Sequence, residues 1–195
     1  MDFNNSETKK NLLRAFAGES QARNRYTFAA AQARKQDLYV IEAAFNFTAG
    51  QEKEHAELFY NRLATASGEN IQIDGSYPID ISDSVVDLLR SAHHNEYEEY
   101  EDAYKNFSEV AQSEGFSDIA DLFKKIAEIE KTHGDRFLRL ADLLEQGKLF
   151  VSDVSVKWMC LNCGFVFEGT AVPPNCPVCR HDRGYFIRLE MLQNP

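Results

Sequence analysis

The chain has 195 residues, of which 44% are hydrophobic and 27% are charged, and its formal net charge is -10. These values are typical of a globular protein with one ordinary domain and a smaller second unit. The negative charge argues against nucleic-acid binding, because a phosphate backbone would be repelled. The sequence has no apolar run long enough to predict a membrane span.

The first ten residues lack the apolar core and cleavage motif of a secretory signal. We therefore expect a cytoplasmic protein. All four cysteines lie between positions 160 and 179. In a reducing compartment such a cluster is more typical of a metal site than of two disulfides.

Residues 1–150 are predicted to form a bundle of four long helices. Capping serines and terminating glycines place the helices at about 6–35, 38–67, 82–115 and 117–147, with Ser82 as the N-cap of the third. The first two helices and the last two are joined by short turns, whereas the link between the pairs is long. Two hairpins with one long crossover form the connectivity of a ferritin-like bundle.

Residues 152–195 are predicted to form a separate small domain, because helical periodicity gives way to prolines and aromatic residues around the cysteines. About forty residues cannot build a sufficient apolar core, so this domain requires a covalent or metal staple.

The cysteines form two Cys-x-x-Cys knuckles, Cys160 with Cys163 and Cys176 with Cys179, separated by twelve residues. Two such knuckles close a tetrahedron of thiolates. The spacing accepts either zinc or iron, and by itself it favours a structural zinc ribbon. A redox-active bundle beside the knuckles would favour iron.

Heptad spacing places acidic and histidine side chains on the apolar seams of the helices. In the second helix, positions 45, 52 and 59 read Phe, Glu, Phe, and in the fourth helix Glu130 interrupts a similar series. Both helices carry Glu-x-x-His with both residues facing the core. The ligand-type side chains predicted to point inward are Glu19, Glu52, His55, Glu96, Glu99, Glu130 and His133.

Buried carboxylates in this number require cations. Leaving one carboxylate unpaired would cost several kcal/mol. The total for all five would exceed a domain's net stability. Carboxylates with imidazoles suit two iron or manganese ions, because zinc prefers fewer ligands and calcium avoids imidazole. One Glu-x-x-His alone is usually an exposed helical pair. Two of them on seams, matched by seam glutamates on the other helices, favour the di-metal site known in ferritin-like proteins.

Other polar residues of the bundle are predicted to lie outside this site. His93 and His94 are interpreted as structural or surface residues. The sequence leaves open whether Tyr26, Tyr100 and Tyr104 only pack in the core or hydrogen-bond a ligand carboxylate. The glutamates expected to be solvated lie off the seams, at Glu54, Glu57, Glu98, Glu101 and Glu128.

Along essentially its whole length the chain resembles rubrerythrin. The resemblance rests on Ala15-Phe-Ala-Gly-Glu-Ser-Gln-Ala-Arg-Asn-Arg-Tyr26, Gln51-Glu-Lys-Glu-His55, Glu96-Tyr-Glu-Glu-Tyr100, Glu130-Lys-Thr-His133 and the two knuckles. It implies a ferritin-like di-iron bundle followed by a rubredoxin-like domain with one iron held by four cysteines, in which zinc could substitute.

The resemblance also implies a function, a non-haem di-iron peroxidase that reduces hydrogen peroxide to water in defence against oxidative stress. Electrons would come from an NAD(P)H-linked reductase or from rubredoxin, through the iron held by the four cysteines. A head-to-tail homodimer would bring each four-cysteine site close to the partner's bundle, because a chain's own tail leaves far from mid-helix.

The same resemblance implies a role for each predicted ligand. Glu99 is the additional carboxylate, and we expect oxidised iron to recruit it because the oxidised pair carries more positive charge. Carried over position by position, the terminal ligands are Glu19 and Glu96, the bridges are Glu52 and Glu130, His133 binds one iron, and His55 and Glu99 are alternatives on the other.

One position departs from the family pattern, since Arg180 follows the second knuckle where rubredoxin-type sites usually carry Gly. That position often needs a positive φ, so we expect backbone strain there and an effect on the tuning of the iron.

Two other functions stay open on the sequence alone. A ferritin-type protein that oxidises and stores iron would not need the cysteine tail. A non-enzymatic zinc-ribbon scaffold would bind zinc, which is colourless, whereas iron held by four cysteines absorbs visible light.

Overall fold

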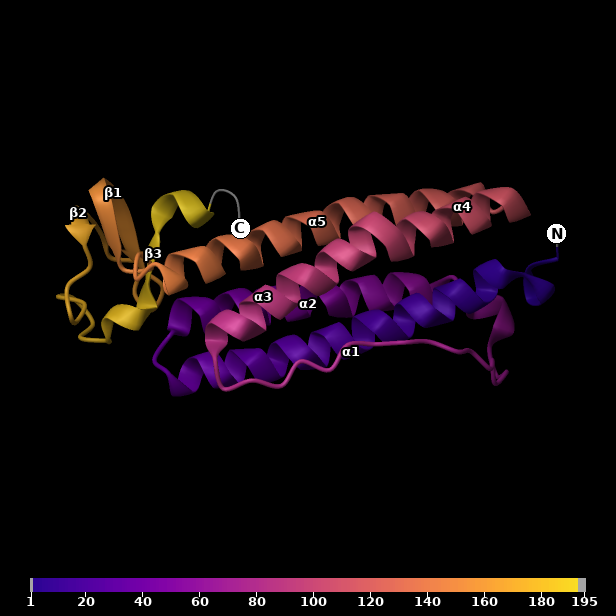
Figure 1. Ribbon diagram of the computed structural model, residues 1–195, viewed down its shortest axis with the longest axis horizontal. Helices are drawn as coiled ribbons and strands as arrows, with labels where there is room; N and C mark the ends of the chain where they lie inside the picture. Colours follow the sequence, from indigo (N-terminus) through magenta and orange to yellow (C-terminus); the bar gives the residue numbers. More distant parts are fainter. Residues whose placement is uncertain (1, 193–195) are drawn as a thin grey trace.

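The computed structural model describes residues 2–192 as an elongated helical bundle with a small β unit at one end (Figure 1). The β unit follows the last helix. The elements of the bundle are α1 (Glu7–Lys35), α2 (Tyr39–Asn61), α3 (Val85–Glu98), a π-helical turn (Glu99–Ala103), α4 (Tyr104–Glu114) and α5 (Ser117–Glu145).

The connectivity is the predicted ferritin-like one. α1 packs against α2, and α3 and α4 pack against α5. Because α3, the π turn and α4 follow one another without a break, they act as one long helix, the third of the bundle. The crossover from α2 to α3 runs back along α1 over the length of the bundle (Figure 1).

Two predicted helix boundaries were wrong. The second helix ends at Asn61, before the predicted Ser67, and a 3₁₀ turn follows. The third helix is capped by Ser84, whose hydroxyl accepts a hydrogen bond from the Asp87 amide at 3.2 Å. Ser82 instead accepts from the Ser84 amide and donates to the Asp87 carboxylate. Both serines fit the capping pattern, and only the backbone conformation distinguishes them.

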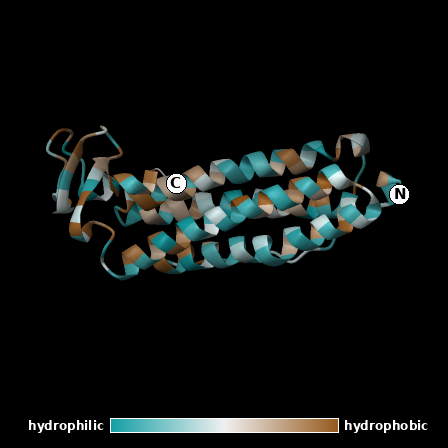
Figure 2. Ribbon diagram, turned by 90° about the horizontal axis from the view of Figure 1, so that it is seen from above, coloured by the Kyte–Doolittle hydropathy of each residue, from teal (hydrophilic) through white to brown (hydrophobic). Residues whose placement is uncertain are grey.

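The apolar core of the bundle is divided into two clusters. One contains Phe45, Leu89 and Phe137 and lies toward the β unit, and the other contains Leu12 and Phe123 and lies toward the far end. Buried charged residues and histidines occupy the level between them on α1, α2, α3 and α5. Hydrophilic and hydrophobic residues are interspersed along the helices (Figure 2). The charged layer is therefore sealed by apolar packing on both sides.

The tail forms a three-stranded antiparallel sheet in the order β2-β1-β3, from β1 (Val151–Cys160), β2 (Val166–Ala171) and β3 (Phe186–Arg188). Its small core contains Trp158 and Phe186, which are both fully buried. The predicted small β domain is confirmed, whereas the predicted division near residues 150–152 stays a prediction.

The tail packs against the end of its own bundle. The ring of Tyr185 stacks on that of Tyr39 at the start of α2, with centroids 4.1 Å apart. Gly184 lies so close to the turn between α1 and α2 that an added Cβ would be 1.9 Å from the carbonyl oxygen of Asp37. Within residues 2–192, no helix combines the length and the apolar character needed to cross a membrane.

We expect Gly184→Ala to loosen the tail from the bundle, at a cost of about 1–3 kcal/mol, because the new methyl group meets backbone that cannot move aside alone. Limited proteolysis should cut the link between α5 and β1 faster than in the parent. The control is Gly169→Ala, whose Cβ would make ordinary contact at 3.5 Å with Phe167. If the link is cut equally slowly in both variants, the close approach of Gly184 to the Asp37 backbone is wrong.

Candidate metal centres

A layer of carboxylates and imidazoles occupies the middle of the bundle. Six of the predicted ligands are no more than 5% exposed. They form two groups whose donor atoms lie within 4.8 Å of one another, and Glu52 and Glu130 belong to both groups. The first group adds Glu19 and His55, and the second adds Glu96 and His133. Two cation positions with two shared carboxylates follow from this arrangement.

The spacing of the donor atoms fits bound metal ions. His133 Nδ1 lies 2.8 Å from a Glu130 oxygen and 3.0 Å from a Glu52 oxygen. His55 Nδ1 lies 3.0 Å from an oxygen of each. None of these atoms has a hydrogen-bond partner within residues 2–192, although all are buried. Neighbouring ligands around one ion at roughly 2.1 Å are about 3 Å apart. The donors therefore converge on shared points rather than on one another.

Burial and mutual repulsion dominate the electrostatics of this layer. Burial raises the pKa of Glu19 and Glu96, and the neighbouring carboxylates raise it further. Burial alone would also raise the pKa of Glu52, but the adjacent imidazoles of His133 and His55 lower it to about 2. Burial opposes the charge on His133, yet Glu130 and Glu52 raise its pKa to about 9. The layer thus attracts positive charge, as protons or as metal ions.

Two tyrosines hold carboxylates of this layer in place. The Tyr104 hydroxyl of α4 donates to Glu19 Oε1 of α1 at 2.5 Å, and the Tyr26 hydroxyl of α1 donates to Glu96 Oε1 of α3. Each carboxylate keeps its other oxygen for the metal layer. Tyr100 instead packs edge-on against the Tyr97 ring. Tyr26 and Tyr104 therefore hydrogen-bond a carboxylate of the layer, whereas Tyr100 packs against another aromatic ring.

Glu99 stands apart from the other predicted ligands. Within residues 2–192, Glu99 belongs to neither group of possible metal ligands, and it is half-buried. Burial, followed by the charges of Glu130 and Glu52, raises its pKa to about 8. It begins the π turn, which the sequence did not predict. His55, its predicted alternative, is the residue placed in the cluster.

The remaining polar residues lie where they were predicted. His93 is half-buried with Nδ1 3.0 Å from the Gly134 carbonyl oxygen, and His94 is exposed beside Glu98. The off-seam glutamates are all exposed, namely Glu54, Glu57, Glu98, Glu101 and Glu128. Tyr77 of the crossover lies near Glu99 and was not predicted, because no periodic pattern in the sequence marks it.

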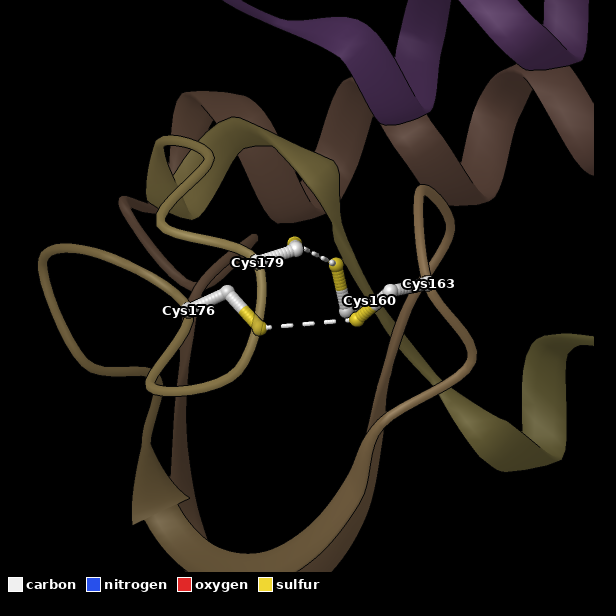
Figure 3. A group of neighbouring side chains, drawn as sticks. All are labelled: Cys160, Cys163, Cys176 and Cys179. Atoms are coloured by element: carbon white, nitrogen blue, oxygen red, sulfur yellow. Dashed lines mark hydrogen bonds between the residues drawn. The ribbon is translucent and has the colours of Figure 1, made fainter.

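The four cysteines meet in the tail with the geometry of a tetrahedral site (Figure 3). The Sγ atoms are 3.7 Å apart both between Cys160 and Cys179 and between Cys163 and Cys176. A tetrahedron with metal–sulfur bonds of about 2.3 Å has edges of about 3.8 Å. All four are free thiols rather than disulfides. The thiolates therefore fit one metal ion.

The two knuckles share one backbone conformation. Gly164 follows the first with φ 76° and Arg180 follows the second with φ 65°. Their amides donate to the Cys160 and Cys176 carbonyl oxygens at 2.8 and 2.9 Å. The predicted positive φ of Arg180 is thus confirmed, with a strain on the order of 1 kcal/mol for a side chain in this region. An amide hydrogen bond from His181 lowers the pKa of the Cys179 thiol to about 6.

Comparison with known proteins places both centres in one family. The family described as Rubrerythrin matches residues 10–141, and the rubrerythrin rubredoxin-like domain matches residues 158–187. Rubrerythrin of Clostridium perfringens is 41% identical, covering 93% of each chain. Rubrerythrin of Porphyromonas gingivalis is 44% identical, covering 93% of this chain and 89% of the relative.

Solved structures share the fold. A mixed-valence structure of nigerythrin aligns with a TM-score of 0.62 at 28% identity, covering 93% of this chain and 86% of the other. A bacterioferritin of Desulfovibrio desulfuricans aligns with a TM-score of 0.64 at 24% identity over 73% of this chain, and shows the fold of the bundle alone. The di-iron site of carboxylates and histidines and the rubredoxin-like site of four cysteines are thus those of the matched family.

We expect Cys163→Ser to release the metal of the tail and to unfold the tail without unfolding the bundle, because the metal replaces a core that forty residues cannot supply. Trp158, the chain's one tryptophan, is fully buried in the tail, so its emission should shift to the red while helical circular dichroism persists. The matched control is Val178→Ser, an exposed knuckle residue. If the tail of metal-free Cys163→Ser resists proteolysis, the tail does not depend on the metal for its fold.

Proposed function

The chain belongs to the rubrerythrin family, and on that premise we propose that it is a non-haem di-iron peroxidase of the cytoplasm that reduces hydrogen peroxide to water. The supporting observation is the presence, in one chain, of a buried carboxylate–imidazole layer with two cation positions and a four-cysteine site. A storage protein needs the first centre and not the second. A zinc-ribbon scaffold needs the second and not the first.

The residues of the layer suit a pair of iron ions. Glu52 and Glu130 would bridge the pair, Glu19 and Glu96 would bind one ion each, and the imidazoles would bind through Nδ1, the nitrogen that faces the carboxylates. Two ferrous ions held there would supply the two electrons that, with two protons, convert one hydrogen peroxide to two waters.

The protein's own contribution is to orient the ligands and to exclude water. Tyr26 and Tyr104 fix one oxygen of Glu96 and Glu19, so these carboxylates cannot rotate freely. The apolar clusters above and below the layer, with Phe45, Phe59 and Phe123 fully buried, close it to bulk solvent along the bundle axis. A dry and preorganised site strengthens every electrostatic interaction inside it.

Glu99 acts, in this proposal, as a carboxylate that the oxidised site recruits. Five carboxylates outweigh the charge of two ferrous ions but not that of two ferric ions. Glu99 lies outside the cluster while His55 lies inside it, which is the arrangement expected of the reduced site. Exchange of the imidazole for the carboxylate would offset the added positive charge.

The four-cysteine site would receive electrons from a reductase or from rubredoxin. Cys163 is exposed at the surface of the tail, so a donor can approach the thiolates closely. The path onward within one chain is long, because α5 continues without a break from His133 to Glu145, about 18 Å at 1.5 Å per residue. We therefore propose that electrons pass in trans, from the tail of one subunit to the bundle of its partner in a head-to-tail homodimer.

The test of the activity is an anaerobic titration of the fully reduced protein with hydrogen peroxide, followed by visible absorption. A peroxidase should be oxidised at both centres, with one peroxide consumed for every two electrons. A ferritin-type function would instead appear as the accumulation of many iron atoms per chain. A scaffold holding zinc in the tail would show no visible band from that centre.

For Glu99→Ala we expect nearly normal ferrous binding but a slow or disordered oxidised site, because the lost carboxylate is needed only at the higher charge. Ferrous affinity and the rate of oxidation by peroxide measure the two effects separately. Glu98→Ala is the matched control, since Glu98 is exposed on the neighbouring position. If Glu99→Ala loses as much ferrous affinity as Glu52→Ala, the recruitment proposal is wrong.

Subunit mixing tests electron transfer in trans. One chain carries Cys160→Ser and so lacks the tail centre, and the other carries Glu52→Ala with His133→Ala and so lacks the bundle centre. Neither homodimer should turn over peroxide with the reductase, whereas subunit exchange should restore turnover in the mixture. A silent heterodimer would show that each tail serves its own bundle.

A further inference from the structure

A cavity of about 280 Å³ lies beside the metal layer and is lined by one of the predicted ligands, Glu99. It lies between α1, the crossover and the third bundle helix, and its lining includes Gly18, Tyr77, Glu99 and Tyr104. Glu99 is half-buried, whereas the six other predicted ligands are at most 5% exposed. Tyr104 is the residue that holds Glu19. The cavity therefore reaches Glu99, which lies outside the cluster, and Tyr104, which holds the buried Glu19.

The ring of Tyr77 stands in this cavity between two glycines. A Cβ at Gly18 would lie 3.6 Å from Tyr77 Cε1 and 4.0 Å from Glu99 Oε1, so Gly18 borders the gap between the ring and the carboxylate. On the other side, a Cβ at Gly75 would lie 2.8 Å from Tyr77 Cε2. The ring is thus packed onto the backbone of Gly75, whereas the side toward Gly18 has room for one methyl group at ordinary contact distance.

The crossover segment that carries Tyr77 is fastened on both sides of it. Arg14 donates to the Asp74 carbonyl oxygen at 3.0 Å and to its carboxylate at 2.6 Å, while Asn95 donates to Asp80 at 2.7 Å. The Tyr77 hydroxyl donates to the Arg14 carbonyl oxygen at 3.1 Å. These contacts hold the ring at one place in the cavity.

We propose that this cavity is the route by which the oxidant reaches the metal layer, and that Tyr77 is the residue that limits oxidant size. The proposal rests on the peroxidase function proposed above. Hydrogen peroxide is small and polar and suits a narrow gap beside Glu99. An alkyl hydroperoxide must carry its hydrocarbon group past the Tyr77 ring, and is rejected there.

The first test compares oxidation of the reduced, iron-loaded protein by tert-butyl hydroperoxide and by hydrogen peroxide. The ratio of the two rate constants should rise on the order of tenfold in Tyr77→Ala, which widens the gap, and fall in Gly18→Ala, which narrows it. Tyr77→Phe keeps the ring and should keep the parent ratio.

Gly50→Ala is the matched control for Gly18→Ala. It makes the same change within a long helix, and its Cβ would meet no atom of the described residues within 4 Å. Both variants gain the same helix propensity from the change of Gly to Ala, but only Gly18→Ala changes the cavity. A ratio that is the same in Gly18→Ala, Tyr77→Ala and the control, in a protein that does reduce peroxide, overturns the limit on oxidant size.

The second test does not depend on turnover. Metal-free protein takes up cobalt(II) at the carboxylate–imidazole layer, and the visible absorption of the bound ion reports the rate. Uptake should be slower in Gly18→Ala and faster in Tyr77→Ala than in Gly50→Ala. Equal uptake rates overturn the route itself. If no variant reduces peroxide but the uptake rates differ as expected, the route stands and the peroxidase function fails.

Discussion

The burial of like charges at one level of the bundle is the constraint on which the rest of the structure depends. Four helices direct carboxylates into a space closed by apolar clusters on both sides. Such a layer is stable only with positive charge inside it, because desolvation and repulsion act together. The long apolar seams above and below supply the packing that holds the helices together around this unfavourable centre.

The π turn explains why one predicted ligand differs from the others. Glu96 and Glu99 are three residues apart, and in a regular α-helix both would face the same neighbour. The π turn begins at Glu99 and widens the helix there. Glu96 stays in the cluster, held by Tyr26, whereas Glu99 lines the cavity. A helix irregularity thus separates a carboxylate of the cluster from one that lines the cavity.

The tail has too small an apolar core to be stable by packing alone, and its four cysteines make up for this. Its sheet buries few large side chains, and the cysteines supply the cohesion that this core lacks. Both knuckles require a residue of positive φ, and at Arg180 the chain accepts the strain that glycine would avoid. Close packing at Gly184 and the stack of Tyr39 on Tyr185 then fix the tail on the bundle end.

The sequence by itself determined the bundle and its crossover, and it predicted the inward-facing carboxylates and histidines of the mid-helix layer and the four thiolates, because helical and knuckle spacing repeat along the chain. It also marked Arg180 as a residue of unusual backbone conformation. Only the tertiary structure decided that His55 rather than Glu99 joins the cluster, that Tyr26 and Tyr104 hold carboxylates while Tyr100 does not, and that the crossover places Tyr77 beside Glu99. Local periodicity fixes which face of a helix a residue occupies. Contacts between segments distant in sequence depend on how the helices and the irregular crossover pack together, and no local pattern encodes that packing.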